Sequence, residues 1–168
     1  EVLLQSGRMN ARGMAYTEVA EYAKLTHFFD GIATSISNDG LLTTHPRRPA
    51  LPAANIYASD NYFALLGVRP QHGRVWSSTP LTADPTTVLT VVISHTVWEA
   101  VFDTAADVIG RTLRINDMTV TVVGVAPRSF SGTGTTNNRH HVWLPLAAYP
   151  LVEKTNQHVF TSPDSAGF

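Results

Sequence analysis

Histidine is the residue type that first suggests chemistry in this 168-residue chain. Seven histidines and no cysteine are present, so a transition-metal site would need imidazole nitrogens together with oxygen ligands. The seven positions are His27, His45, His72, His95, His140, His141 and His158. No two of them form an HExxH pair, and no three fall at the spacing of one helix face. We interpret the adjacent pair His140 and His141 as loop residues that are structural or solvent-exposed, so the sequence predicts no metal site.

Glycines, serines and carboxylates give no stronger chemical signal. Residues 132–134 (Gly-Thr-Gly) lack the third glycine of a dinucleotide-binding loop. Ser131 lacks the glycine two positions earlier that a nucleophile elbow needs, because Ser129 stands there. Two carboxylate pairs are expected to be solvated rather than used for acid–base work: Asp103 with Asp107, and Glu18 with Glu21. The sequence therefore predicts no enzyme and no cofactor.

The elements that would position these residues are mostly strands. Short apolar or alternating runs predict strands over residues 2–4, 32–36, 41–44, 53–57, 88–93, 112–115, 118–125 and 142–144. Residues 37–40 (Ser-Asn-Asp-Gly) predict a tight turn between the second and third of these strands. Paired alternation on both sides of Asn116 and Asp117 predicts a β-hairpin.

Helices are predicted at three places. Residues 16–29 have helical spacing and end at Gly31, and residues 61–67 form a short turn that ends at Gly67. Ser94 is expected to cap a third helix. The aromatic side chains are expected to pack rather than to line a pocket: Phe28, Phe29, Tyr62, Phe63, Trp98 and Phe102. Three prolines over residues 45–52 predict a connector or lobe boundary, and residues 126–139 an exposed loop.

Composition excludes several classes of protein. With 43% hydrophobic residues and a net charge of -1, the chain is not disordered, and its scattered basic residues argue against nucleic-acid binding. No run reaches the ~20 apolar residues of a membrane-spanning helix. The chain starts at Glu1 without an initiator Met, so we expect it to be a piece of a longer protein.

Three stretches of the sequence resemble one known family. Residues 58–74 match its pattern S-x-N-Y-F-x-x-L-G-V-x-P-x-x-G-R. Residues 92–127 match V-I-S-x-x-x-W, V-I-G-R-T-L-R-I-N-G and T-V-V-G-V-A-P, and residues 142–146 match V-W-L-P-L. The chain thus resembles the MacB-like periplasmic core domain of ABC transporter permeases of the MacB/FtsX type. It is more similar to the longer, duplicated permeases of unknown cargo than to the macrolide exporter, so no cargo is implied.

The resemblance implies an α+β fold with two lobes. Residues 1–52 would form the first porter-like βαβ unit, and residues 53–146 a β-rich, sabre-like lobe. Residues 147–168 would be a connector toward a second porter-like unit that this chain lacks. In this family the domain lies between the first and second membrane helices of the permease, so the resemblance implies a periplasmic location within an integral membrane protein.

The residues shared with the family are interpreted as structural. They are Asn61, Tyr62, Phe63, Gly67, Pro70, Gly73, Arg74, Trp98, Gly110, Arg111, Asn116, Gly124 and Pro127, which we call the signature residues. The glycines would permit turns and Pro70 would fix a bend. Where the family has Asn-Gly, this chain has Asn116 followed by Asp117, so Asp117 takes a positive φ or the turn is of another type.

Arg74 and Arg111 allow two interpretations. A guanidinium can tie loop carbonyls, or a carboxylate across a lobe, which is the interpretation we favour. The alternative is contact with a partner, because arginine is enriched at interfaces.

Two functions from different classes follow. The first is a non-catalytic extracytoplasmic domain of an ABC permease that couples ATP-driven movement of membrane helices to a periplasmic substrate or partner. Its partners would be the rest of the permease with its membrane helices, a cytoplasmic ATPase subunit or domain, and a periplasmic partner protein, with no nucleic acid. The alternative is a free-standing extracytoplasmic ligand-binding module with a preformed apolar pocket.

Overall fold

The computed structural model describes residues 2–4, 31–44, 49–76, 88–134 and 140–153. In this part the chain is a mixed fold of α and β elements, rich in strands, with few and short helices. No helix in these ranges is both long and apolar enough to cross a membrane.

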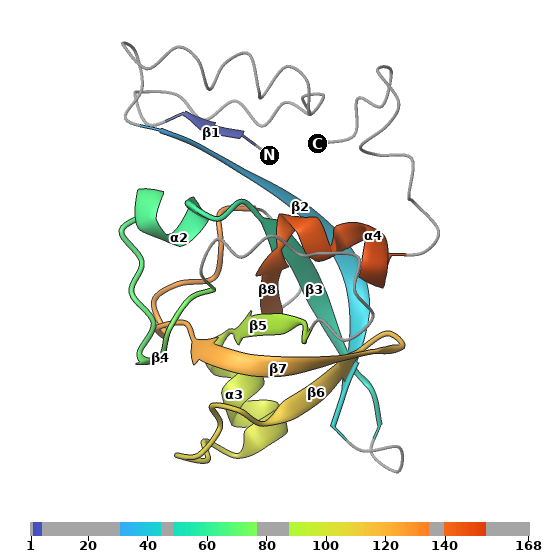
Figure 1. Ribbon diagram of the computed structural model, residues 1–168. Coiled ribbons are helices and arrows are strands. Elements are labelled where there is room, and N and C mark those ends of the chain that lie inside the picture. The colour runs from blue at the N-terminus through green and yellow to red at the C-terminus, as the bar shows by residue number, and fades with distance from the viewer. Residues whose placement is uncertain (1, 5–30, 45–48, 77–87, 135–139, 154–168) are drawn as a thin grey trace.

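Six strands close into a ring (Figure 1). In spatial order they are β2 (Ile32–Thr43), β3 (Leu51–Ala58), β8 (His141–Pro145), β5 (Thr90–Ile93), β7 (Met118–Val125) and β6 (Thr112–Ile115). β6 closes the ring because it pairs with β7 on one side and with the end of β2 on the other, at Leu42–Ile115 and Thr43–Arg114. Two short strands extend the sheet beyond the ring: β1 (Val2–Leu4) on β2 and β4 (His72–Gly73) on β7.

The ring mixes parallel and antiparallel pairs. β3 is parallel to β8 and β5 is parallel to β7, whereas the other ring pairs are antiparallel. The register of β5 on β7 shifts between Val91 and Val92. This bulge explains why Val122 and Val125, which are three positions apart, both belong to the core inside the ring.

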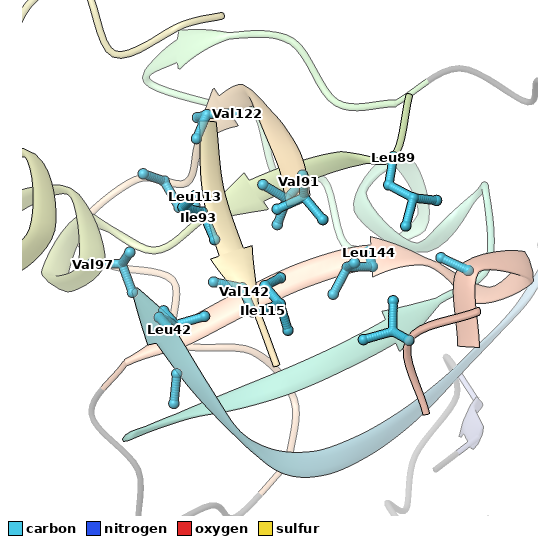
Figure 2. Close-up of a cluster of buried hydrophobic side chains, with 14 of the residues drawn as sticks. Leu42, Leu89, Val91, Ile93, Val97, Leu113, Ile115, Val122, Val142 and Leu144 are labelled. Atoms are coloured by element: carbon cyan, nitrogen blue, oxygen red, sulfur yellow. The ribbon is translucent and has the colours of Figure 1, made fainter. Parts of the chain in front are cut away.

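Apolar side chains fill the ring (Figure 2). We call this core the inner cluster; it includes Leu42, Leu89, Val91, Ile93, Val97, Leu113, Ile115, Val122, Val142 and Leu144. Alternate residues of the same strands point outward into a second core, the outer cluster, which includes Ile56, Tyr62, Phe63, Trp76, Val92, Val123 and Trp143. The sheet is therefore covered on both faces, which explains the nearly continuous apolar sequence of β5.

Three α-helices and one 3₁₀ turn complete the described structure. They are α2 (Tyr62–Leu65), α3 (His95–Phe102), η1 (Leu146–Ala148) and α4 (Tyr149–Val152). The Ser94 hydroxyl caps α3 by accepting a hydrogen bond from the Val97 N–H at 3.3 Å. The helix ends at Asp103, which has a left-handed φ of 52°.

Most of the predicted elements are confirmed. The predicted hairpin strands have the bounds of β6 and β7, and the strands predicted over residues 2–4, 53–57, 88–93 and 142–144 correspond to β1, β3, β5 and β8. The caps predicted at Ser94 and Gly67 are also present. The helix predicted over residues 16–29 lies outside the described residues.

The tight turn predicted at residues 37–40 is wrong. β2 runs without interruption from Ile32 to Thr43, and the four residues pair with Ile56, Asn55, Ala54 and Ala53 of β3. Pairing along the whole of β3 outweighs the local turn preference of Ser-Asn-Asp-Gly.

Two further predictions need correction. His141 is not a loop residue, because it begins β8 and is buried. The loop predicted over residues 126–139 is not exposed throughout: Ala126 is buried, and Phe130 stacks on Trp143 with ring centroids 5.3 Å apart. Its residues 135–139 lie outside the described part. In the hairpin turn, Asn116 rather than Asp117 has the positive φ, of 51°.

The expected boundary between residues 52 and 53 falls inside β3. The ladder between β2 and β3 also joins residues assigned to the first unit with residues assigned to the second. The division into 1–52, 53–146 and 147–168 remains a prediction.

Candidate functional site

The first group of signature residues lies on α2, which covers the outer face of the ring. Tyr62 and Phe63 are buried in the outer cluster, and the Phe63 ring lies 5.8 Å from that of Trp143. Asn61 precedes the helix and donates a hydrogen bond from Nδ2 to the Ile32 carbonyl at 2.8 Å. These residues attach α2 to the start of β2.

A second group brings β4 against β7. Gly73 and Gly124 are paired across the two strands. A Cβ at Gly73 would overlap the Val123 carbonyl oxygen, and a Cβ at Gly124 would overlap the Arg74 carbonyl oxygen. Gly73 also has a φ of 70°. Both positions therefore require glycine, because the two backbones approach too closely for a side chain. Pro70 lies in the irregular segment between α2 and β4.

The third group holds the loops around the hairpin. The Trp98 indole N–H donates to the Ala105 carbonyl at 3.0 Å, which closes the loop after α3. Gly110 has a φ of 87°, and its N–H donates to the Val122 carbonyl. Asn116 exchanges hydrogen bonds with Leu41 of β2: its N–H donates to the Leu41 carbonyl and its Oδ1 accepts from the Leu41 N–H. Pro127 accepts a hydrogen bond from the Phe130 N–H.

Both signature arginines make local contacts at the surface. Arg111 Nη2 pairs with Asp107 Oδ1 at 2.5 Å, and this hydrogen bond lowers the pKa of the Asp107 carboxyl. Arg74 Nη1 donates to the carbonyl of the neighbouring Val75 at 3.2 Å. Each guanidinium is thus tied within its own segment rather than across a lobe, and both side chains face solvent.

The four histidines in the described part of the chain do not come together as a metal site; His27, His45 and His158 lie outside it. In the described ranges no three His, Asp or Glu side chains are grouped closely enough to hold an ion. His95 lies between Gln71, whose Nε2 is 2.9 Å from His95 Nδ1, and Glu99, whose Oε1 is 3.3 Å from His95 Nε2. Burial, followed by the charge of His140, lowers the pKa of His141.

One polar group was not predicted from the sequence. The Tyr57 hydroxyl donates to Glu153 Oε1 at 2.7 Å, and Asn55 Nδ2 lies 3.5 Å from the same oxygen. Burial, and then the bond to Glu153, raises the pKa of Tyr57 well above its usual range, so Tyr57 stays a neutral donor. Alternation along β3 signals that Asn55 and Tyr57 share a face, but nothing local signals that Glu153 returns to them.

Comparison with known proteins gives a consistent result. The family model described as MacB-like periplasmic core domain matches residues 2–165. The macrolide export ATP-binding/permease protein MacB of Sodalis glossinidius (strain morsitans) is 33% identical over 105 residues, which are 62% of this chain. This chain spans only 16% of the length of that relative.

Solved structures agree on the fold. The periplasmic region of MacB from Actinobacillus actinomycetemcomitans has a TM-score of 0.62 at 16% identity, covering 91% of this chain and 67% of that one. The extracellular domain of the transporter YknZ from Gram-positive bacteria has a TM-score of 0.66 at 14% identity, covering 88% and 70%. This chain belongs to the family of MacB-like periplasmic core domains, and is an extracytoplasmic part of an ABC transporter permease in the membrane.

Proposed function

We propose that this domain couples ATP-driven movement of the permease's membrane helices to a periplasmic substrate or partner protein, without catalysing a reaction itself. Its partners are the rest of the permease with its membrane helices, a cytoplasmic ATPase subunit or domain, and a periplasmic partner protein. The mechanism is movement of the domain as a rigid body.

The observation that carries this proposal is the path of β2. This single strand of 12 residues is about 40 Å long at ~3.3 Å per residue. It starts against β1, near the chain's first residues, and ends against β6 and the β6–β7 turn (Figure 1). A displacement at one end of β2 therefore reaches the far side of the ring through one continuous hydrogen-bonded element.

The proposed division of the chain fits this mechanism. A porter-like unit over residues 1–52 and a sabre-like lobe over residues 53–146 would share the ladder between β2 and β3. The two would then move together. Residues 147–168 would lead to the second porter-like unit.

Spin labels in the whole permease, reconstituted in a bilayer with its ATPase, test the proposal. Asp60 follows the end of β3, and Asp117 follows Asn116, whose N–H donates to the Leu41 carbonyl near the start of β3. This chain has no cysteine, so once any cysteines elsewhere in the permease are replaced, Asp60→Cys and Asp117→Cys are the labelling sites. We expect the distance between the two labels to stay constant on ATP binding. A fluorophore at Asp117→Cys alone should change its quenching by energy transfer to an acceptor-labelled lipid, which acts over distances comparable to the length of β2.

Either of two results would contradict the proposal. A change in the distance between the two labels would show that the ring deforms rather than moves as a body. Constant quenching of the Asp117→Cys fluorophore with and without ATP would show that the domain does not respond to the ATPase.

A further inference from the structure

Glu153 marks the point where the described chain leaves the ring. It directly follows α4, and its N–H donates to the Tyr149 carbonyl at 2.9 Å. Its carboxylate turns back to β3, where Oε1 accepts from the Tyr57 hydroxyl at 2.7 Å and lies 3.5 Å from Asn55 Nδ2. Glu153 is 96 residues from Tyr57 in sequence, so this contact joins two distant parts of the chain.

The helix before Glu153 is held by the inner cluster. Tyr149 is 2% exposed and Val152 is 4% exposed. The Tyr57 and Tyr149 rings meet edge to face with centroids 5.0 Å apart. One residue of β3, Tyr57, therefore contacts α4 through its ring and the residue after α4 through its hydroxyl.

The burial of Asn55 in this contact is energetically unfavourable. Asn55 is fully buried, and its Oδ1 has no hydrogen-bond partner, which is unfavourable for a buried amide. Asn55 also lies directly over Gly40 of β2, where an added Cβ would overlap the amide group. An apolar residue at position 55 would avoid the unmet acceptor. Packing alone therefore does not explain a buried asparagine beside Glu153.

The Tyr57 hydroxyl, which is the donor in this contact, stays protonated. Burial raises the pKa of Tyr57, and the bond to Glu153 raises it further, so the hydroxyl keeps its proton under physiological conditions. Glu153 thus always meets a donor on β3.

We propose that Asn55, Tyr57 and Glu153 form a latch that transmits displacements of the chain beyond residue 153 to β3, and hence to the ring. This inference rests on the proposed function. It adds a second point of attachment: β2 connects the ring to the chain that precedes it, and the latch connects the ring to the chain that follows. The latch residues are positioning residues, and none of them is a signature residue.

The test uses the whole reconstituted permease with the fluorophore at Asp117→Cys. Tyr57→Phe removes only a hydroxyl, and Glu153→Gln keeps the size of the side chain. A hydrogen bond to a charged group contributes about 1.5 kcal/mol or more, which corresponds to a factor of about ten. We therefore expect about tenfold faster amide exchange at residues 151–153 in Tyr57→Phe. Because β2 still attaches the ring to the preceding chain, we expect a smaller ATP-dependent change in quenching, rather than none, in both variants.

Tyr62→Phe is the matched control. It removes a tyrosine hydroxyl that lies 3.1 Å from Thr133 Oγ1, in the outer cluster. It should leave both the exchange at residues 151–153 and the quenching response unchanged.

The outcomes separate the two proposals. If Tyr57→Phe keeps the full ATP-dependent quenching of the wild type, or fails to accelerate exchange at residues 151–153, the latch is overturned and the proposed function stands. If the wild type itself shows no ATP-dependent quenching, the proposed function fails. Equal loss of response in Tyr62→Phe would overturn the latch, since any small perturbation would then suffice.

Discussion

At the scale of single residues, the close approach of β4 and β7 gives the clearest prediction. In Gly124→Ala the new Cβ would overlap the Arg74 carbonyl oxygen, which belongs to backbone and cannot rotate away. We expect a loss of about 2–4 kcal/mol in the free energy of unfolding, measured in urea. Gly67→Ala is the control, because Gly67 has a φ of 64° but open space around it. It should lose about 1 kcal/mol. Equal losses would contradict the close approach.

His141 predicts a dependence of stability on pH. Burial lowers its pKa in the folded chain from 6.5, so between the folded and unfolded pKa values only the unfolded chain holds the proton. Stability should therefore fall as the pH drops below about 6.5 and stop falling, for this group, below the folded pKa. Unfolding in urea at about pH 7.5 and about pH 5.5 measures this.

The control for this prediction is a second histidine. His141→Gln should reduce the loss of stability between the two pH values, whereas His72→Gln, at an exposed position, should retain it. An unchanged pH dependence in His141→Gln would assign the effect to other groups.

Substitution of Arg111 distinguishes between a structural role and a contact with a partner. Its ion pair with Asp107 spans four residues, and the two side chains are 43% and 76% exposed, so solvent screens the attraction. We expect Arg111→Ala to keep the urea midpoint of the wild type. The arginine would then be available for a partner. A clear drop in the midpoint would instead show that the pair holds the loop.

At the scale of elements, Ser94 joins a helix to a strand. Its hydroxyl accepts from the Val97 N–H, which caps α3, and from the buried His141 N–H at 3.2 Å, where β8 begins. Ser94→Ala should cost about 2–3 kcal/mol, roughly 1 for the cap and the rest for the lost hydrogen bond from the His141 N–H. Glycine caps helices almost as well as serine, so Ser94→Gly isolates the second contribution. Equal stability of Ser94→Gly and wild type would contradict it. Urea unfolding gives both values.

At this scale, the predictions that succeeded concern features whose contacts are close in sequence. Ser94, Gly67 and the Asn116 turn act within four residues, so their sequence pattern was sufficient. The turn predicted at residues 37–40 was wrong because these residues pair with β3, and their partners lie outside the short sequence window from which the turn was predicted. In the candidate site, the alternation of β3 could predict that Tyr57 faces the inner cluster. Only the folded structure shows that Glu153 contacts Tyr57.

At the scale of the whole molecule, the ring was not predictable from pattern. Its closure depends on Leu42 and Thr43 meeting Ile115 and Arg114, residues separated by most of the described chain. The parallel pairing of β3 with β8 joins residues that are still farther apart in sequence. The expectation of two lobes came from the family resemblance rather than from periodicity. The resemblance does not specify which residues of two strands are paired.

Closure of the ring predicts the effect of a disulfide. Thr43 and Arg114 are cross-strand partners of β2 and β6, so Thr43→Cys with Arg114→Cys should form a bond on oxidation. Closing a loop of roughly 70 residues stabilises by up to about 4 kcal/mol. The measurement compares urea unfolding of the oxidised and reduced double variant, with Thr43→Cys alone as the control. If the pair does not oxidise, the two strands are not adjacent.

The closed ring has a consequence for behaviour at high concentration. Strand edges with free N–H and C=O groups are templates on which other chains add, and proteins limit them. Here each of the six ring strands has two neighbours over at least part of its length, and the strands that end the described sheet, β1 and β4, have only three and two residues. The longest stretch with one described partner is residues 35–41 of β2, because β1 pairs with residues 32–34 and β6 with Leu42 and Thr43. In the described sheet, a domain crowded beside its own copies on a membrane thus presents one longer open edge, on β2, where the exposed charge of Asp39 disfavours the addition of another strand.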